Sequence, residues 1–459
     1  MEARLDIPRV VVAGASSGSG KTTVAVALTR ALRARGLAVA PFKCGPDYLD
    51  PTYHARAAGR PSHNLDGWMM GREASLATFA RRARGADVAV IEGVMGLYDG
   101  ASPAGEDGST AEMAKWLEAP ALAVVDASGM ARTVAALARG LADFDPGLRL
   151  AGIVCNRVGS RGHLALLREA LRSPPVVGGL PSRADLAFPE RHLGLVTARS
   201  EALAETTLDA WGDAAAEWLD LDAIVAIARS APPIHAPAAS DPSPKVSDRC
   251  RIGVALDEAF HFYYDDNLAR LESLGARVIP FSPVHDRALP DVHGLYLGGG
   301  YPEVHAAALA ANGGLREAVR TFAAAGRPIY GECGGFMFLC EAIRTADGLT
   351  HPMVGLLPGV AVMQDRLAAL GYVEIETRQP TLLGPAGLRL RGHQFRYSEL
   401  AGVPDDASRA YVVIRRRGGE AALEGWTRGN VLGSYVHAHW ASSPEAAAGF
   451  VNACSRNVG

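Results

Sequence analysis

The sequence predicts an α/β protein with two domains. In the first half of the chain, short apolar runs rich in β-branched residues alternate with alanine- and leucine-rich stretches of helical length. This alternation is typical of a parallel sheet that is covered by helices on both faces. A second α/β pattern begins at residue 251, and 459 residues with 48% apolar composition suffice for two or three cores.

Composition and charge indicate which kinds of molecule the protein is not expected to bind. The net charge is −3, and the longest basic run is Arg415–Arg417, so we expect neither nucleic acid nor an anionic membrane as a partner. No apolar segment is long enough to span a bilayer, and the N-terminus lacks the apolar core of a signal peptide, so we expect a cytoplasmic protein. The six cysteines lack C-x-x-C spacing and should be free thiols.

Residues 10–23, VVVAGASSGSGKTT, join an apolar strand to a helix through a glycine-rich loop. Backbone N–H groups and the helix dipole converge in such a loop, which suits the phosphates of ATP. The usual spacing would place glycine at position 15, whereas this chain has Ala15 with Gly14 before it, which leaves room for a loop one residue longer. The alternative is an ordinary glycine-rich turn. The predicted nucleotide-binding residues are Gly18, Gly20, Lys21, Thr22 and Thr23.

Acidic residues follow two of the next predicted strands. Asp47 lies in the loop after strand 37–41, and Glu92 ends strand 87–91. Mg²⁺ prefers hard oxygen ligands, so Thr22, Asp47 and Glu92 form a predicted metal site. Helix capping or solvation of these acids is the competing interpretation. The remaining strands of this half are expected at residues 121–125, 152–155 and 176–180.

Asn156 follows the predicted strand 152–155. Its amide could bind the edge of the adenine, or the residue could simply form a turn. The sequence leaves both readings open.

The composition then changes. Residues 231–245 are rich in proline and alanine and show no periodicity, which indicates a semi-rigid linker. We therefore expect a nucleotide-binding synthetase domain at 1–230, a linker at 231–248 and a second domain at 249–459.

In the second domain a cysteine stands between a strand and a helix. Residues 328–330 form a short apolar strand candidate, followed by Gly-Glu-Cys333-Gly-Gly. This arrangement is typical of a nucleophile elbow, in which a tight turn exposes the side chain and neighbouring N–H groups bind an oxyanion. Cys340, on the following helix, fits a buried structural role better. The predicted oxyanion-binding residues are Gly299, Gly300 and Gly334.

A cysteine nucleophile needs a base. Strand candidate 431–435 leads to His437 and His439, which share one face if the extended conformation continues. One histidine would activate Cys333 and the other would orient the first, although either could be a satisfied surface residue. Residues 391–398, rich in donors and aromatics, line a substrate site or form an edge strand.

Taken together, these motifs resemble the cobyrinic and hydrogenobyrinic acid a,c-diamide synthase family over nearly the whole chain. They occur in the family's order: GASSGSGKTT, KCGPDYLDP, EGVMGLYDG, LPSR with PERHLGL, GGGYPE, GECGG, GHQFRYSE and SYVHAHW. The resemblance implies a dethiobiotin synthetase-like ATPase domain followed by a class I glutamine amidotransferase domain. It also implies ATP and Mg²⁺ as cofactors.

In that family, ATP phosphorylates a side-chain carboxylate of the corrin, and ammonia from L-glutamine displaces the phosphate. The resemblance therefore implies that Cys333 is the glutaminase nucleophile and His437 its base. The third triad position usually holds glutamate, whereas this chain has His439. The residues implied to lie beside the corrin carboxylate are Tyr48, Leu49, Asp50 and Asp99.

Two other functions remain open on the sequence alone. Cobyric acid synthase has the same two domains but amidates other corrin carboxylates, and the KCGPDYLDP loop favours the a,c-diamide enzyme. A non-enzymatic P-loop switch protein with an inert appended domain is a more distant alternative, against which Cys333 and His437 argue. A homodimer is a candidate assembly.

Overall fold

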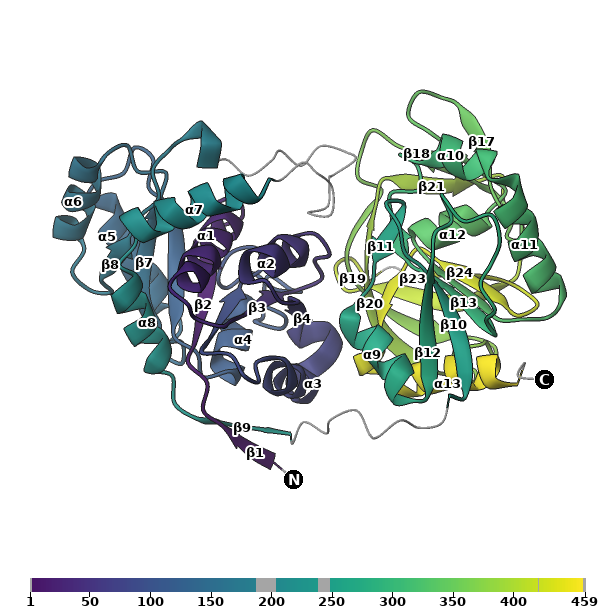
Figure 1. Ribbon diagram of the computed structural model, residues 1–459, viewed down its shortest axis with the longest axis horizontal. Helices are drawn as coiled ribbons and strands as arrows, with labels where there is room; N and C mark the ends of the chain where they lie inside the picture. Colours follow the sequence, from purple (N-terminus) through teal and green to yellow (C-terminus); the bar gives the residue numbers. More distant parts are fainter. Residues whose placement is uncertain (1, 187–203, 238–247, 420, 457–459) are drawn as a thin grey trace. The chain divides into compact units, whose positions relative to one another are not determined.

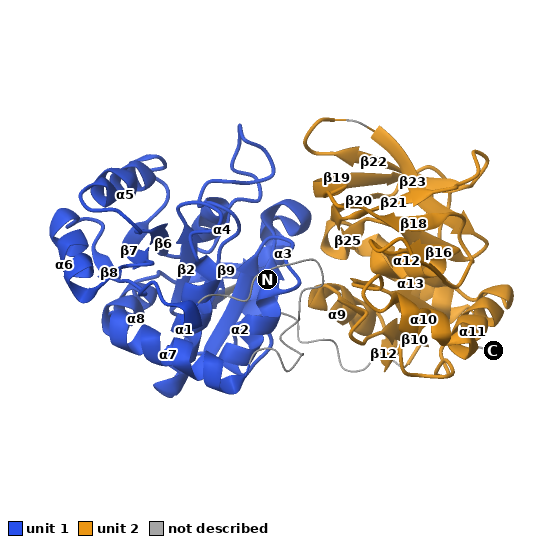
Figure 2. Ribbon diagram, turned by 90° about the horizontal axis from the view of Figure 1, so that it is seen from above, with its two compact units in different colours: residues 1–239 blue, residues 240–459 orange. Residues whose placement is uncertain are grey.

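The computed structural model describes residues 2–186, 204–237, 248–419 and 421–456, and the chain divides into two compact units, residues 1–239 and 240–459 (Figure 2). The motif PERHLGL, residues 189–195, lies outside the described residues. Within the described ranges, no helix has both the length and the apolar character needed to cross a membrane.

Unit 1 is built on a parallel sheet of seven strands in the order β4-β3-β5-β2-β6-β7-β8 (Figure 1). The phosphate-loop strand β2 lies near its centre. The strands are β2 (Arg9–Gly14), β3 (Val39–Cys44), β4 (His63–Leu65), β5 (Val88–Glu92), β6 (Ala121–Asp126), β7 (Leu150–Asn156) and β8 (Val176–Gly178).

Helices cover both faces of this sheet. Val10 and Val12 of β2 face a core formed with α1, α2, α7 and α8, whereas Val11 and Ala13 face a core formed with α3 and α4. A third cluster packs α5 and α6 against β6 and β7. The helices are α1 (Lys21–Ala34), α2 (Asp50–Ala58), α3 (Gly67–Arg82), α4 (Thr110–Trp116), α5 (Thr133–Asp143), α6 (Arg161–Ala170), α7 (Glu205–Trp218) and α8 (Leu221–Arg229).

A two-stranded antiparallel sheet joins the two ends of unit 1. Strand β1 (Glu2–Leu5) pairs with β9 (Ile234–Pro237). The buried Arg9 reinforces this junction, because its guanidinium donates to the carbonyls of Leu117 and Pro232. The start of the expected linker 231–248 is therefore regular structure, and residues 238–247 lie outside the described residues.

Unit 2 contains a mixed sheet of ten strands in the order β12-β10-β13-β15-β24-β23-β22-β19-β20-β25. The strands from β12 to β24 are parallel, and the others pair antiparallel. Its strands are β10 (Cys250–Ala255), β12 (Ala276–Phe281), β13 (Gly294–Leu297), β15 (Ile329–Glu332), β19 (Ala369–Thr377), β20 (Arg389–Arg396), β22 (Arg409–Arg415), β23 (Ala421–Arg428), β24 (Val431–Ser434) and β25 (His437–His439).

Smaller elements complete unit 2. One core packs α10, α11 and α12 against the sheet, and a second packs α9 and α13. The helices are α9 (Asp265–Ser273), α10 (Ala306–Ala311), α11 (Gly313–Ala324), α12 (Gly334–Leu339) and α13 (Pro444–Ser455). The short strands are β11 (Phe260–Phe262), β14 (Gly299–Gly300), β16 (Ala342–Arg344), β17 (Thr350–Pro352), β18 (Val360–Met363) and β21 (Ser398–Ala401).

Candidate active sites of the two units

The glycine-rich loop lies between the end of β2 at Gly14 and the start of α1 at Lys21. Gly18 and Gly20 have φ angles of +77° and +91°, which favour glycine. A Cβ placed on Gly14 would lie 2.6 Å from Ser19 Oγ and 2.8 Å from the carbonyl oxygen of Ser16. The loop therefore packs so closely against residue 14 that only glycine fits there. The glycine of this loop is thus needed at position 14, and position 15 can hold alanine.

Two polar side chains line the loop. The Ser19 hydroxyl is buried and has no hydrogen-bond partner among the described residues, so it is available to a ligand. Asn156, at the end of β7, donates from Nδ2 to the carbonyl of Ser19 at 3.0 Å, and a Cβ on Gly20 would lie 2.0 Å from that nitrogen. Asn156 therefore clamps the loop, and its contact with adenine stays a prediction.

A buried polar cluster lies beside the loop. The hydroxyl of Thr22, in the first turn of α1 before Thr23, donates to Glu92 Oε1 at 2.7 Å and lies 3.3 Å from Asp50 Oδ2. Lys43 Nζ lies 2.8 Å from the same oxygen of Glu92 and 2.9 Å from Asp50. Burial lowers the pKa of Lys43, but Asp50 and Glu92 outweigh this effect and raise it, so the lysine is charged.

His54 completes the cluster. Its Nε2 lies 2.5 Å from Glu92 Oε2, and the side chain is 2% exposed. Burial raises the pKa of Glu92, but Lys43 and His54 outweigh it, so the pKa is lowered and the carboxylate is ionised. Sequence reasoning missed His54; the available signal was its position one turn after Asp50 on α2.

Asp50 joins the predicted metal-binding residues, because its Oδ2 lies 3.3 Å from the hydroxyl of Thr22. The metal-binding role of Asp47 stays a prediction. Asp47 Oδ1 accepts the backbone N–H groups of Leu49 and Asp50 at 2.8 and 2.9 Å and so holds the start of α2. Capping, which we gave as the competing interpretation, thus describes this contact of Asp47.

The cluster offers hard oxygen donors, two carboxylates and one hydroxyl, which is the chemistry that Mg²⁺ selects. Within the described parts of the chain, no group of three or more histidine, cysteine, aspartate or glutamate residues could hold a metal ion by itself. A metal here would therefore need further oxygens from a bound nucleotide.

Two loops frame this site. Tyr48 and Leu49 are half-buried, in a loop that Asn64 braces through the carbonyls of Gly45 and Asp47. The second loop, residues 93–100, contacts the phosphate loop through the N–H of Leu97, which donates to the carbonyl of Gly14 at 2.8 Å.

Asp99 is exposed in this second loop. Its Oδ2 accepts the N–H of Gly96 at 3.0 Å. The corrin-side roles of the four predicted residues Tyr48, Leu49, Asp50 and Asp99 stay predictions.

In unit 2, Cys333 forms the turn between β15 and α12. Its φ and ψ are +47° and −102°, a strained conformation for a residue with a side chain, and its N–H donates to the carbonyl of Ser434 at 2.8 Å. This is the strand-turn-helix geometry of the predicted elbow. Burial and the charge of Glu303 raise the pKa of the thiol to about 12, and Arg396 acts in the opposite direction. The resting cysteine is therefore protonated.

Strand β24 ends at Ser434, before the predicted histidine pair. His437 and His439 lie in a separate strand, β25, at the edge of the sheet beside β20, with His437 opposite His393. Burial lowers the pKa of His437 to about 3 and that of His439 to about 4, so both rings are neutral at pH 7. A neutral imidazole can accept a proton from a thiol.

The glycine loop before α10 lies against both Cys333 and His437. A Cβ on Gly299 would lie 2.4 Å from Cε1 of His437, and one on Gly334 would lie 3.1 Å from the backbone nitrogen of Gly300. The oxyanion role of Gly299, Gly300 and Gly334 stays a prediction.

His439 makes its contacts away from His437. Its Nδ1 accepts the N–H of Ala441 at 3.2 Å, and its ring lies 4.6 Å from that of Tyr264. The ring parallel to His437, at 4.9 Å and 14°, belongs to His393, whose Nδ1 lies 2.9 Å from the hydroxyl of Tyr264. Residues 391–398 form β20 and the start of β21, and β20 is internal to the sheet, not at its edge.

Glu332 links the elbow to the histidine strand. Its Oε1 accepts the N–H of Ala438 at 3.1 Å and the hydroxyl of Tyr330 at 2.8 Å, while Oε2 accepts the hydroxyl of Tyr296 at 2.8 Å. Burial raises the pKa of this carboxyl to about 7. Sequence reasoning did not single it out, although an acid in a buried apolar strand is a signal in its own right.

Comparison with known proteins supports both halves of this description. Residues 10–196 match the CobQ/CobB/MinD/ParA nucleotide-binding domain family, and residues 251–445 match the CobB/CobQ-like glutamine amidotransferase domain family. The predicted α/β class of both domains is thereby confirmed.

Full-length relatives extend the comparison. A cobyrinate a,c-diamide synthase of Leptospira interrogans is 49% identical over 98% of this chain and 99% of its own length. A hydrogenobyrinate a,c-diamide synthase of Streptomyces coelicolor is 43% identical over 98% of each chain. A cobyrinate a,c-diamide synthase of Methanothermobacter thermautotrophicus is 41% identical over 96% of this chain and 98% of its own. The resemblance seen in the motifs is thus confirmed, and the chain belongs to the cobyrinate a,c-diamide synthase family.

Proposed function

We propose that this protein is an ATP- and glutamine-dependent ligase that converts the a and c side-chain carboxylates of cobyrinic or hydrogenobyrinic acid into amides. The observation that carries the proposal is the presence of two different reactive sites in one chain. A phosphate loop with a buried acid cluster suits carboxylate activation, and a cysteine elbow with a neutral histidine suits amide hydrolysis. The names of full-length relatives supply the substrate class.

In unit 2, the thiol of Cys333 attacks the side-chain amide carbon of glutamine while His437 takes its proton. A C–S bond forms, the C–N bond breaks, and His437 returns the proton to the leaving ammonia. Water then hydrolyses the thioester to glutamate. N–H groups from Gly299, Gly300 and Gly334 would stabilise the oxyanion, a contribution that in other enzymes is worth about 10² to 10³ in rate per donor.

In unit 1, a carboxylate oxygen of the corrin attacks the γ-phosphorus of ATP, ADP leaves, and an acyl phosphate forms. Ammonia then attacks the acyl carbon and inorganic phosphate departs. Lys21 offsets charge on the phosphoryl oxygens. Thr22, Asp50 and Glu92 would hold Mg²⁺, which supplies further charge compensation, while Lys43 pairs with both carboxylates and His54 pairs with Glu92.

Product analysis tests this function. The protein is incubated with ATP, Mg²⁺ and glutamine together with cobyrinic acid, hydrogenobyrinic acid or the corresponding a,c-diamide, and products are identified by mass spectrometry. We expect a diamide product from the first or second substrate, with one ADP and one glutamate per amide. Consumption of the a,c-diamide alone would instead indicate a cobyric acid synthase, and ATP hydrolysis without any amidation would indicate a switch protein.

A further inference from the structure

The strand that carries His437 is short and lies at the end of the ten-stranded sheet, beside β20. The triad position that usually holds an orienting glutamate is His439 in this chain, and its Nδ1 accepts the N–H of Ala441 instead of contacting His437. Other groups must therefore hold His437 in a fixed direction. The backbone on each side of this residue shows which groups do so.

Glu332 holds the residue after His437. Its Oε1 accepts the N–H of Ala438 at 3.1 Å, and two tyrosine hydroxyls, each at 2.8 Å, donate to the two oxygens of the carboxylate. The carbonyl of Ala438 accepts from Nδ2 of the buried Asn267 at 2.8 Å. Both backbone polar groups of Ala438 are thus bonded to buried side chains, so this part of β25 has a defined position.

A chain of hydrogen bonds holds the residue before His437. The N–H of Val436 donates to Oγ of Ser434 at 3.1 Å, and this hydroxyl donates to Oε2 of Glu424 at 2.9 Å. Gln394 holds the carboxylate in turn, since its Nε2 lies 3.1 and 3.3 Å from the two oxygens of Glu424. Ser434, Glu424 and Gln394 are all buried. Successive hydrogen bonds in a buried chain polarise and strengthen one another.

Both sets of contacts also reach the nucleophile. The backbone carbonyl of Ser434 accepts the N–H of Cys333 at 2.8 Å, while the hydroxyl of the same residue accepts the N–H of Val436. Glu332 precedes Cys333 directly in the chain. Each set therefore connects the backbone of the nucleophile to a neighbour of the base. Proton transfer from a thiol to an imidazole depends on such relative placement, because an error of about 1 Å can cost on the order of 10² in rate.

The ring of His437 has little freedom once its backbone is held. One face stacks on His393 at 4.9 Å and 14°. The ring also packs against Gly299, where a Cβ would lie 2.4 Å from Cε1. Fixing the backbone therefore fixes the direction of the imidazole.

We propose that Glu332 and Glu424 are positioning residues that replace the missing third member of the catalytic triad. The first acts on the residue after His437, and the second acts through Ser434 on the residue before it. Together they keep the imidazole directed at the thiol of Cys333. The inference rests on the proposed glutaminase function. It explains why two carboxylates are retained in the interior of unit 2, where their desolvation costs free energy.

The test uses four variants. Ser434→Ala removes the acceptor of the Val436 N–H but keeps the backbone carbonyl that binds Cys333. Glu424→Leu removes the acceptor of the Ser434 hydroxyl. Glu332→Leu removes the acceptor on the other side of the base, whereas Glu332→Gln keeps an oxygen that can accept the same N–H.

Two assays compare these variants. The first measures kcat and KM for glutamate release from glutamine. The second measures the rate at which iodoacetamide alkylates Cys333, with the modified residue identified by peptide mass spectrometry. Alkylation requires a base to take the thiol proton but requires no glutamine, so it reports on His437 independently of the proposed reaction.

We expect Ser434→Ala and Glu332→Leu each to lower kcat by about 10- to 100-fold with KM nearly unchanged, because a displaced base impairs proton transfer more than binding. Alkylation should slow in parallel. Glu332→Gln should keep most of both activities. Glu424→Leu should match Ser434→Ala, and the two changes combined should cost no more than either alone, since both act along one chain of hydrogen bonds.

A His437→Ala protein separates positioning from general stability. Residues that act only through the base should cause no further loss when Ser434→Ala or Glu332→Leu is added to His437→Ala. A merely structural role would lower the remaining activity there as well. Near-ultraviolet circular dichroism verifies the tertiary structure of each variant. Ser434→Ala removes a single oxygen atom and tests the inference even if Glu332→Leu does not fold.

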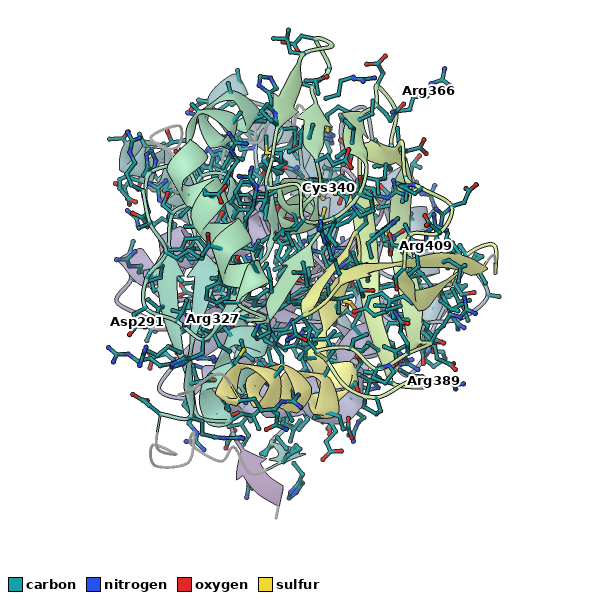
Figure 3. All side chains as sticks on the ribbon, turned by 90° about the vertical axis from the view of Figure 1, so that its right-hand side faces the viewer. Asp291, Arg327, Cys340, Arg366, Arg389 and Arg409 are labelled. Atoms are coloured by element: carbon teal, nitrogen blue, oxygen red, sulfur yellow. The ribbon has the colours of Figure 1, made fainter. Side chains whose placement is uncertain are left out.

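Matched controls come from the same unit. Ser443, like Ser434, is a buried serine whose hydroxyl donates to a glutamate, here Oε2 of Glu445 at 3.2 Å. Glu376 on β19 pairs at the surface with Arg389, whose side chain is 80% exposed (Figure 3). Ser443→Ala and Glu376→Leu should leave glutamate release and alkylation unchanged.

Unchanged glutamate release and alkylation in Ser434→Ala and Glu332→Leu, or losses that add to that of His437→Ala, would overturn the inference. Failure of the proposed function has a different signature. A wild type whose Cys333 is alkylated in a manner that depends on His437, but that releases no glutamate, would refute the glutaminase function and leave the positioning of His437 standing.

Discussion

At the scale of single residues, the buried cluster of unit 1 combines one lysine with two carboxylates around the hydroxyl of Thr22. Buried carboxylates persist in ionised form only when they are paired, and Lys43 provides that pairing. Since the lysine offsets only part of the negative charge, the cluster remains suited to attract a cation. We therefore expect that metal binding depends on Asp50 together with Glu92.

Asp50→Asn should therefore lower amidation from glutamine and from ammonium salt alike, by about 10- to 100-fold at limiting Mg²⁺. Asp47→Asn should have a mild effect, because an asparagine oxygen can still accept the N–H groups at the start of α2. ADP release measured against Mg²⁺ concentration, with ammonium as nitrogen source, compares the two. The reverse order of severity would make Asp47, not Asp50, the more important acid of the metal site.

Because the pKa of Glu332 is raised, we expect the stability of unit 2 to depend on pH in the wild type. Below its usual pKa of 4.5 the carboxyl is protonated in both the folded and the unfolded state, whereas above the folded pKa of about 7 the folded state bears the full cost of a buried charge. The raised pKa therefore destabilises unit 2 progressively between these pH values, by roughly 3 kcal/mol at most. Glu332→Gln should gain stability relative to the wild type as the pH rises from 4.5 to 8.

Denaturant unfolding at both pH values, followed by hydrogen exchange in unit 2, measures this difference. Glu376→Gln serves as the control, because Glu376 on β19 is half-exposed and pairs with Arg389 at the surface. A difference that did not change with pH would mean that the Glu332 carboxyl titrates near its usual pKa.

At the scale of elements, the position of His437 depends on β25. This three-residue strand is held at the sheet edge by β20 and by the carboxylate of Glu332, not by continuation of β24. His439 shares the strand, but its Nδ1 is engaged with the backbone of Ala441. The two histidines are thus placed together and bonded differently.

His437→Ala should lower glutaminase activity by about 10² to 10⁴, as expected for the loss of a general base, while ammonium-dependent synthesis continues. His439→Ala should be milder, because the ring acts on local backbone geometry. Steady-state glutamate release from the two variants compares them. Equally severe losses would make His439 an obligate member of the catalytic group.

The loop that carries Tyr48 and Leu49 gives a prediction about substrate selection. An aromatic and an aliphatic side chain that are only half-buried beside the phosphate site offer an apolar surface to a large flat ligand. Tyr48→Ala or Leu49→Ala should slow one amidation more than the other, since misplacement by about 1 Å can cost on the order of 10² in rate. Chromatographic time courses should then show a mono-amidated intermediate, and proportional slowing of both steps would make the loop purely structural.

Some secondary-structure elements and site residues could be predicted from the sequence, and others could not. Parallel strands such as β5 and β6 are buried on both faces, so they read as continuous apolar runs and were placed within about two residues. The antiparallel strands β19, β22 and β23 mix exposed and buried residues, and their weak patterns were missed. Contiguous motifs revealed the phosphate loop and Cys333, whereas Asp50, His54 and Glu332 acquire their contacts only through tertiary structure.

At the scale of the whole molecule, each unit has its own cores and its own reactive site. In the proposed mechanism, carboxylate activation uses the phosphate loop of unit 1, and glutamine hydrolysis uses the cysteine elbow of unit 2. The two half-reactions are therefore expected to be separable by mutation.

Cys333→Ala should abolish amidation with glutamine and leave synthesis from ammonium salt largely intact. Cys340→Ala, which removes a buried thiol at the end of α12, is the matched control and should keep both activities. Amide formation is measured with each nitrogen source. If ammonium fails to support synthesis by a folded Cys333→Ala protein, the assignment of separate half-reactions is wrong.

The pairing of β1 with β9 has a consequence for how the protein is made. Strand β1 is synthesised before the rest of unit 1, yet its partner at Ile234–Pro237 follows the other described elements of this unit. The sheet β2 to β8 can assemble during translation, but the first residues must wait for this late segment before they find a partner. Unit 1 is thus closed last at its two ends, and deletion of residues 2–5 should leave the phosphate site intact while exposing the edge of β9 to protease.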